Sequence, residues 1–274
     1  MSARGALALR DAYEWLRYTP GVRLLNPLWR RLERPYLALV RALAGGDAVP
    51  VRVAGEVVLL TSKYAMVPWE REETVCLAAF RAALPAGGVV MDVGAFLGLY
   101  ALVGARWAGP TGHVLAFEPM PGTRVVLERH VAWNGLQDRV TVRGSACGDA
   151  TGTIALHATR DEADSSVGAL PRPGALAVMV PRTTLDAEAV LLGRPVAVVK
   201  IDVEGQELAV LRGGAAMIAR DKPVLLVSVH VEPLREQGLA PADVYAWLDA
   251  AGYAHRVIAE DHEVHVLATP RSRA

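Results

Sequence analysis

Short apolar runs alternate with amphipathic stretches from residue 88 onward. Five runs have the length and composition of buried strands: residues 88–93, 113–118, 139–145, 195–202 and 223–229. The amphipathic stretches predict helices near residues 97–108, 121–134, 206–219 and 240–251. Strands separated by helices imply right-handed crossovers and a parallel sheet. Two β-rich runs on either side of Glu260 and Asp261 then predict a terminal antiparallel hairpin. We therefore expect an α/β fold with a doubly wound sheet.

The first 46 residues have a different pattern and predict a separate helical segment. Apolar residues recur at helical spacing from Leu9 to Leu16, and Pro20–Gly21 interrupts them before a second helix. Eight arginines stand against three acidic residues here, with aromatic rings between them. Two interpretations stay open: helices that dock on a membrane surface or a partner, a second copy of the chain included, and a helical cap packed on the main domain. We expect a helical cap over residues 1–46 and one domain over residues 47–274.

Other segments interrupt the alternation. Residues 49–61 predict a hairpin that turns at Ala54–Gly55, and residues 68–84 predict a helix that begins at Pro68. Residues 147–194 form a long stretch between two expected strands, with only two strand-like runs in it. Because structureless loops of this length inside a compact domain are usually functional or disordered, we expect this insertion to line the substrate site.

Composition excludes several classes of protein. The 274 residues carry 29 basic and 29 acidic side chains, so the net charge gives no reason to expect a nucleic-acid partner. Two cysteines make neither a disulfide framework nor a zinc site. No apolar run reaches about 18 residues, so no integral membrane segment is expected. We expect a soluble, cytoplasmic protein.

The first expected strand ends in a turn suited to a ligand. In "VVMDVGAFLGLYAL", residues 89–102, Gly94 stands at the tight turn and Gly98 in the first turn of the next helix. Glycines at these points allow a ligand and a neighbouring element to approach the backbone closely. Glu118 ends the next strand, where a carboxylate can accept hydrogen bonds from both hydroxyls of a ribose. Together these residues predict a site for an adenosine-containing cofactor.

The residues around the turn favour one such cofactor over another. A dinucleotide site has a middle glycine that lets backbone N–H groups face a pyrophosphate, whereas the middle position here is Ala95. Asp92, two residues before the first glycine, would repel a pyrophosphate and attract the ammonium group of an amino acid. S-adenosylmethionine has that ammonium group and a ribose but no phosphate. The turn therefore predicts S-adenosylmethionine rather than NAD.

A second group of charged residues follows the fourth expected strand. In "KIDVEG", Lys200, Asp202 and Glu204 alternate onto one face, and Gly205 opens the next helix. Charges on an apolar strand are costly unless they pair or lie at the carboxyl edge of the sheet, where open α/β sheets bind ligands. His230 follows the fifth strand at that edge, and a histidine can accept the proton of a substrate hydroxyl. Structural pairing with Lys200, and a merely tolerated histidine, are the alternatives. Asp202, Glu204 and His230 would also suit a divalent metal ion, but the sequence shows no dedicated set of ligands, so we expect no metal.

Four segments, "VVMDVGAFLGLYALVG", "VLAFEPMP", "RTTLD" and above all "VVKIDVEGQELAVLRGG", resemble the FkbM family of S-adenosylmethionine-dependent methyltransferases. The resemblance covers roughly residues 64–232 and leaves residues 1–46 uncovered. It implies a Rossmann-like class I methyltransferase sheet with strand order 3-2-1-4-5-7-6 and the last strand antiparallel. It also implies, as the usual activity, O-methylation of a hydroxyl on a sugar or another natural product.

The resemblance assigns roles to the matching positions. Those that would hold the methionine, the ribose and the adenosine are Asp92, Gly94, Ala95, Gly98 and Glu118. Cys147 and Asp149 fall where the family places the adenine edge, with a turn-forming aspartate as the alternative for Asp149. His230 would be catalytic, and Asp202 and Glu204 join it as candidate catalytic residues from their place at the edge of the sheet. The family often has an acid two residues before this histidine, where this chain has Ser228.

The sequence thus predicts an S-adenosylmethionine-dependent O-methyltransferase with a small-molecule substrate. One rival is an NAD(P)-dependent oxidoreductase, which Asp92, Ala95 and the terminal hairpin disfavour. Another is a non-catalytic protein that binds adenosine and docks through residues 1–46; it would bind the cofactor without turnover.

Overall fold

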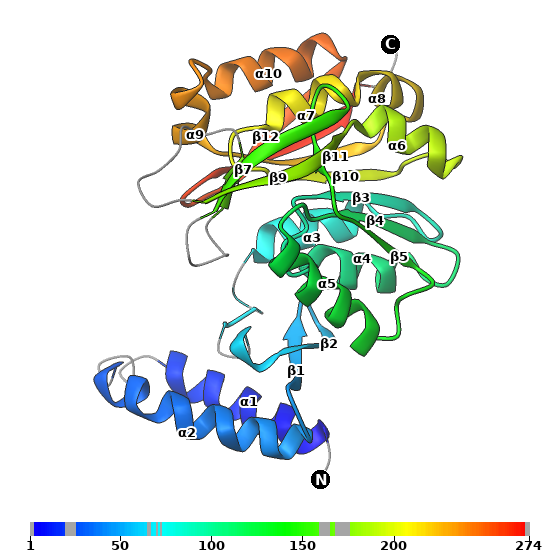
Figure 1. Ribbon diagram of the computed structural model, residues 1–274. Helices are drawn as coiled ribbons and strands as arrows, with labels where there is room; N and C mark the ends of the chain where they lie inside the picture. The colour runs from blue at the N-terminus through cyan, green and yellow to red at the C-terminus, as the bar shows by residue number, and fades with distance from the viewer. Residues whose placement is uncertain are drawn as a thin grey trace. The chain divides into compact units, whose positions relative to one another are not determined.

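Two units of different architecture make up the chain (Figure 1). The first comprises residues 1–74 together with 132–135, and the second comprises residues 75–131 and 136–274. The structure is a computed structural model, and it describes residues 3–19, 26–64, 67–69, 71, 73–158, 165–167 and 176–271.

The first unit joins a helix pair to a hairpin. Its elements are α1 (Ala3–Tyr18), α2 (Asn26–Ala44), β1 (Ala48–Val53), β2 (Glu56–Thr61) and η2 (Ser62–Tyr64). Ala6 of α1, Val40 of α2 and Val49 of β1 share one buried cluster, and the rings of Tyr13 and Tyr36 stack with centroids 4.1 Å apart. The hairpin is therefore part of the same core as the helices.

The hairpin turns where the sequence predicts it. Ala54 and Gly55 both have positive φ, 46° and 82°, as two-residue hairpin turns require. The edge of β2 is covered by one side chain. Asn134 Nδ2 donates to the carbonyl of Leu59 at 2.9 Å, and its Oδ1 accepts from the amide of Leu59 at 3.0 Å.

The second unit is built on a mixed sheet. In the described residues seven strands form it, in the order β12-β13-β11-β10-β3-β4-β5. They are β3 (Val89–Val93), β4 (His113–Phe117), β5 (Val140–Arg143), β10 (Val198–Ile201), β11 (Val224–Val229), β12 (Tyr253–Glu260) and β13 (Val264–Pro270). Pairs among β5, β4, β3, β10 and β11 are parallel, and β13 is antiparallel to both its neighbours. Counted along the chain, the order reads 3-2-1-4-5-7-6. The expected α/β fold is confirmed.

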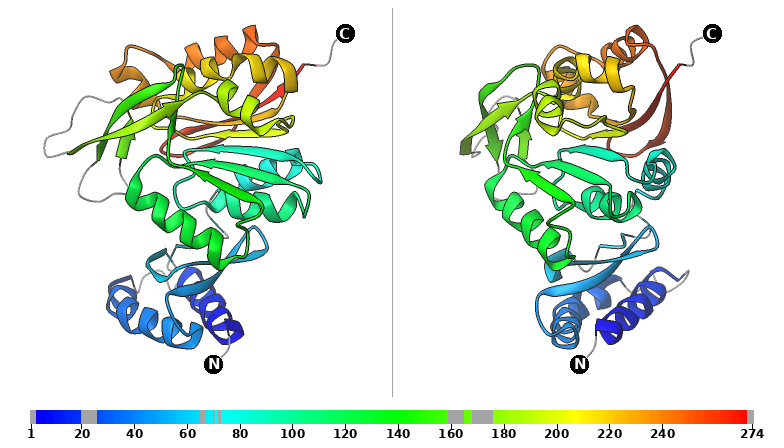
Figure 2. Two further views of the ribbon diagram at one scale, coloured as in Figure 1. Left: turned by 45° about the vertical axis from the view of Figure 1, so that its right-hand side comes forward. Right: turned by 90° about the vertical axis from the view of Figure 1, so that its right-hand side faces the viewer.

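Helices cover both faces of this sheet (Figures 1 and 2). On one face lie α3 (Thr74–Ala83), α4 (Leu99–Trp107) and α5 (Pro121–Trp133). On the other lie α6 (Leu185–Leu192), α7 (Glu207–Gly213), α8 (Ala215–Asp221) and α10 (Pro241–Ala250), and the short α9 (Val231–Glu236) follows β11. Every residue of β3 and β10 is buried as a result, which explains their continuous apolar character. None of the described helices is both long and apolar enough to cross a bilayer.

Residues 147–194 contain more regular structure than the sequence suggested. In the described part, β6 (Ala146–Cys147), β7 (Gly152–Ala158), β8 (Ser165–Val167) and β9 (Leu176–Thr183) form a second sheet in the order β6-β9-β7-β8, and α6 follows. Leu156 and Val180 pack with Ala146 and Met120 at its centre. The sequence predicts a polar loop over residues 159–168 and a proline turn over residues 170–174. Ser165–Val167 of that loop form β8 instead, and the rest of the loop and the turn lie outside the described part of the chain.

Two predicted helices have different bounds in the structure. The helix expected from Pro68 begins at Thr74, because Glu73 has a φ of 47° that no α-helix accommodates. The single helix expected over residues 206–219 is two helices, α7 and α8, divided at Gly214. A Cβ atom at the preceding Gly213 would lie 1.9 Å from the carbonyl oxygen of Gly148, so close packing selects glycine there.

Candidate functional site

The turn after β3 requires glycine at two points. Gly94, Phe96 and Gly98 have φ values of 77°, 48° and 83°, in the left-handed region that favours glycine. A Cβ atom at Gly94 would lie 1.7 Å from the carbonyl oxygen of Asp202, and one at Gly98 would lie 2.1 Å from Cδ1 of Leu127. Gly94 thus packs against the chain just after β10, and Gly98 packs against α5.

Glu118, the residue after β4, faces this turn. Its Oε2 accepts a hydrogen bond from the amide of Phe96 and its Oε1 one from the amide of Met120, both at 2.9 Å. A carboxylate offers about four acceptor sites, so two further hydroxyl groups can be bound. Burial raises the pKa of Glu118 to about 7, although the two backbone hydrogen bonds and Lys200 oppose the shift.

Lys200 connects the turn to the acidic residues after β10. In the pairing of β10 with β3, Lys200 lies beside Asp92. Its Nζ donates to the carbonyl of Gly94 at 3.0 Å and lies 3.7 Å from Asp92 Oδ1 and 3.0 Å from Asp202 Oδ2. Asp92 is fully buried. In this arrangement Lys200 links its carboxylate to that of Asp202. A direct contact between Asp92 and an ammonium group stays a prediction.

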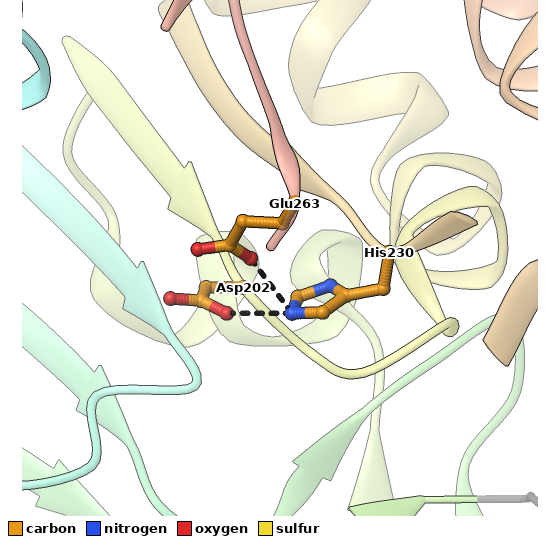
Figure 3. A group of neighbouring side chains, drawn as sticks. All are labelled: Asp202, His230 and Glu263. Atoms are coloured by element: carbon orange, nitrogen blue, oxygen red, sulfur yellow. Dashed lines mark ion pairs between the residues drawn. The ribbon is translucent and has the colours of Figure 1, made fainter. Parts of the chain in front are cut away.

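His230, the residue after β11, is surrounded by carboxylates (Figure 3). Its Nδ1 lies 2.7 Å from Oε1 of Glu207, a residue with no exposed surface. Its Nε2 lies 2.7 Å from Glu263 Oε2, 3.6 Å from Asp202 Oδ1 and 3.8 Å from Glu204 Oε1. The structure therefore brings together the three expected catalytic positions and adds two acids.

These neighbours change the chemistry expected of His230. Burial alone would lower its pKa, but the neighbouring carboxylates of Glu207, Glu263 and Asp202 raise the pKa to about 11. Both ring nitrogens point at carboxylates, whereas a general base needs a lone pair directed at the substrate. The role of His230 as proton acceptor stays a prediction, and this geometry does not favour it.

Asp202 and Glu204 differ in their surroundings. Burial opposes the charge of Asp202, but Lys200 and His230 outweigh it and lower the pKa of Asp202. Glu204 has a φ of 49° and its side chain is 47% exposed. Such backbone strain in a residue other than glycine costs about 1–3 kcal/mol and clusters at functional sites. Glu204 is thus the more accessible carboxylate of the two.

Cys147 and Asp149 lie at the end of β6. Cys147 is buried, and burial together with Glu188 raises the pKa of its thiol. The side chain of Asp149 is 51% exposed, and its Oδ1 accepts from Arg182 at 3.3 Å. Contact of either residue with an adenine stays a prediction; Asp149 is the one that presents a polar side chain to solvent.

Sequence reasoning missed Glu207 and Glu263. Glu207 follows Glu204 by three residues in "VEGQE" and supplies, from α7, the acid that the position of Ser228 lacks. Ser228 is instead within 3.1 Å of His265 Nδ1. Glu263 reaches the site because β13 pairs with β11 in a register that places Val229 opposite Val264. No local sequence signal identifies such a contact.

The family model described as the methyltransferase FkbM domain matches residues 92–254, more than half of the chain. The chain belongs to the FkbM methyltransferase family. The matched residues include the glycine turn, Glu118, Asp202 and His230, whereas Glu263 lies beyond them.

Solved structures similar to this FkbM chain share little sequence with it. The methyltransferase FkbM from Methylobacillus flagellatus KT is 17% identical over 93% of this chain and 60% of that one, with a TM-score of 0.48. The SAM-dependent O-methyltransferase from Thermotoga maritima is 12% identical over 84% and 80%, with a TM-score of 0.45. Aeropyrum pernix fibrillarin, solved with S-adenosyl-L-methionine, is 14% identical over 71% and 74%, with a TM-score of 0.43. The chain thus spans less than two thirds of the length of the first of these. No curated protein matches the sequence.

The cofactor of this FkbM domain is S-adenosylmethionine, and the residues of the turn fit it. Glu118 is a buried carboxylate held by two backbone amides, with acceptor sites left for two ribose hydroxyls. The glycines keep the backbone bare of side chains beside it. The acidic residues at the same edge suit a cofactor without phosphate groups.

Proposed function

We propose that the chain transfers a methyl group to a hydroxyl oxygen of a small molecule, a sugar or another hydroxylated natural product. One observation carries this proposal: Lys200 Nζ contacts both the carbonyl of Gly94 and the carboxylate of Asp202 at 3.0 Å. The cofactor turn and the acidic residues around His230 therefore share one edge of the sheet. An acceptor hydroxyl loses a proton when its oxygen is methylated, and carboxylates at this edge are able to accept it.

The turn has a positioning role in this proposal. S-adenosylmethionine, when bound, supplies an electrophilic methyl group on a sulfonium. Glu118 accepts the ribose hydroxyls, and Gly94, Ala95 and Gly98 leave space for the methionine and adenosine parts. Asp92 orients Lys200, which holds the turn against Asp202. Correct placement of two reactants supplies most of the rate in such transfers.

Glu204 is the proton acceptor in this proposal. It is the more exposed carboxylate beside His230, and its strained backbone holds it at the edge of the sheet. Glu204 takes the hydroxyl proton as the acceptor oxygen gains the methyl group. Asp202 and His230 hold their positions through Lys200 and Glu207 and keep the local field fixed.

The test is methyl transfer to a panel of hydroxylated sugars and natural products, with formation of S-adenosylhomocysteine measured by mass spectrometry. With an accepted substrate, Glu204→Gln is expected to lower kcat about 100-fold or more, because a general base contributes about 10²–10⁴. Cofactor affinity should be unchanged. Glu236→Gln, at an exposed position of α9, is the matched control and should behave as the wild type.

Three outcomes would contradict parts of this proposal. Full activity of Glu204→Gln removes that residue as the base. A methylated nitrogen or carbon in the product overturns O-methylation. Cofactor binding without turnover across the panel favours the non-catalytic alternative.

A further inference from the structure

The surroundings of His230 carry more negative charge than their cations balance. Among the described residues, four carboxylates lie within 3.8 Å of its ring nitrogens: Asp202, Glu204, Glu207 and Glu263. Lys200, the lysine among the positive partners, is shared between Asp202 and Asp92. The other partners are histidines, which carry charge only when protonated: His230 itself, and His265 and His262 at 3.5 and 3.8 Å from Glu263. Buried carboxylates are normally paired or bound to metal ions. The excess points to a cation.

Three donor atoms converge in this group. Asp202, His230 and Glu263 each offer one ligand atom, and these atoms lie within 4.8 Å of one another; Figure 3 shows the two carboxylates directed toward Nε2 of the imidazole. Glu263 is 7% exposed, and within the described chain its Oε2 has no hydrogen-bond partner, although Nε2 lies 2.7 Å away. This carboxylate oxygen is buried and lies beside a ring nitrogen without an aligned hydrogen bond. Such a pair of atoms is suited to coordinate one and the same ion.

The other ring nitrogen is already fixed. Nδ1 of His230 is bound to Oε1 of Glu207 at 2.7 Å, and the same oxygen accepts from the amide of Gly205 at 2.9 Å. Metal-ligating histidines almost always donate their second N–H to such a carboxylate, which sets the tautomer and orients the ring. Glu207 therefore prepares Nε2 as the ligand atom.

We propose that Asp202, His230 and Glu263 bind a divalent first-row transition-metal ion such as Mn²⁺. Two carboxylates suit Mn²⁺ and Mg²⁺, and the imidazole favours a transition metal over Mg²⁺ or Ca²⁺. The site lies at the carboxyl ends of β10 and β11, beside Glu204, where an ion also binds a substrate oxygen if the proposed function holds. The sequence predicted no metal because Glu263 reaches the cluster only through the pairing of β13 with β11.

A neighbouring group, Asp261, Glu263 and His265, is the rival for the same ion. Its Asp261 side chain is 53% exposed, and Nδ1 of His265 lies by the hydroxyl of Ser228 rather than by a carboxylate. The rival thus lacks the buried acid that orients the histidine in the proposed site.

The test is a titration of the full-length, chelator-treated protein with MnCl₂, in which the EPR signal of aqueous Mn²⁺ reports the unbound ion. The wild type should bind one ion per chain. Asp202→Asn, His230→Gln and Glu263→Gln should each weaken binding by more than about tenfold, and Glu207→Gln by about tenfold through the orientation of the ring. His265→Gln should bind as the wild type does. Circular dichroism and the thermal shift caused by S-adenosylmethionine identify variants that have not folded.

Failure of the wild type to bind Mn²⁺ saturably overturns the proposal, whatever the variants do. So does a wild-type affinity in folded Asp202→Asn and Glu263→Gln. Loss of binding in His265→Gln with retention in His230→Gln assigns the ion to the rival group. Because binding is measured without methyl transfer, failure of the proposed function leaves this result unaffected.

Discussion

At the scale of single residues, Glu118 shows how burial prepares a group for a ligand. Its pKa of about 7 is above the ordinary 4.5, mainly because of burial, with Asp92 adding to the shift and Lys200 reducing it. Between these pH values the folded chain binds a proton that the unfolded chain has released. Stability from this group therefore falls as the pH rises from about 4.5 to about 7, and it is constant above that. The shift corresponds to about 3 kcal/mol.

Cofactor affinity should depend on pH through the same carboxyl. Ribose hydroxyls donate to the ionised form, so raising the pH from about 6 to about 8 should tighten binding of S-adenosylmethionine about tenfold. Isothermal titration calorimetry at both pH values measures this. The amino group of the cofactor also titrates near this range. The change of affinity with pH is therefore measured for Glu118→Gln too, which should bind the cofactor weakly and lack the contribution of the carboxyl group. An equal slope in both proteins would show that Glu118 is not the responsible group.

His230 marks the limit of prediction at this scale. Its position after β11 was readable from the sequence, and so were Asp202 and Glu204 beside it. Its partners were not, because Glu207 belongs to the next helix and Glu263 to the terminal hairpin. A residue's place at a sheet edge follows from local pattern, whereas its protonation and ligands depend on distant chain segments.

At the scale of elements, the turn after β3 and the end of β10 form one packed unit. Gly94→Ala would place a methyl group 1.7 Å from the carbonyl oxygen of Asp202. Backbone cannot move aside cheaply, so we expect a loss of more than about 4 kcal/mol in the free energy of unfolding, or failure to fold. Urea denaturation measures it.

Gly109→Ala is the matched control for this change. Gly109 has a φ of 75°, nearly that of Gly94, but no atom lies within 4 Å of a Cβ placed there. It should cost only the left-handed penalty of about 1–2 kcal/mol. Similar losses in the two variants would mean that backbone conformation, and not the contact with Asp202, makes glycine necessary at position 94.

Helices and strands with a local sequence signal were predicted correctly, and features without one were missed. The parallel strands and the terminal hairpin follow from apolar periodicity, and the Ala54–Gly55 turn follows from its residues. The start of α3 was misplaced because the left-handed Glu73 has no sequence signature. The division between α7 and α8 at Gly214 was missed; Gly213 beside it packs against Gly148, which is far away in the chain.

At the scale of the whole molecule, the compact units divide the chain at residue 74, whereas the sequence placed a boundary at residue 46. The reason is that Val49 of β1 is buried with Ala6 and Val40 of the helices. A pattern of helices followed by strands does not reveal that the first hairpin shares the core of the first two helices.

The side chain of Asn134 should contribute to the stability of the first unit. Asn134→Ala removes both hydrogen bonds to the backbone of Leu59, and we expect a cost of about 1–3 kcal/mol. Hydrogen exchange of the Leu59 amide should accelerate by about tenfold or more. Gln137→Ala, at an exposed position three residues later, should leave exchange of the Leu59 amide as slow as in the wild type. Faster exchange in this variant too would show that the hydrogen bonds of Asn134 are not the cause.

The bond between Asn134 and Leu59 also bears on the order in which the protein is made. The two residues are 75 positions apart, so β2 leaves the ribosome long before its edge partner has been synthesised. The first unit therefore cannot complete its hydrogen bonding during its own translation; it must wait until the whole of α5 has emerged. A pause in translation before residue 134 has emerged from the ribosome would leave the edge of β2 exposed to other nascent chains, and a pause after its emergence would not.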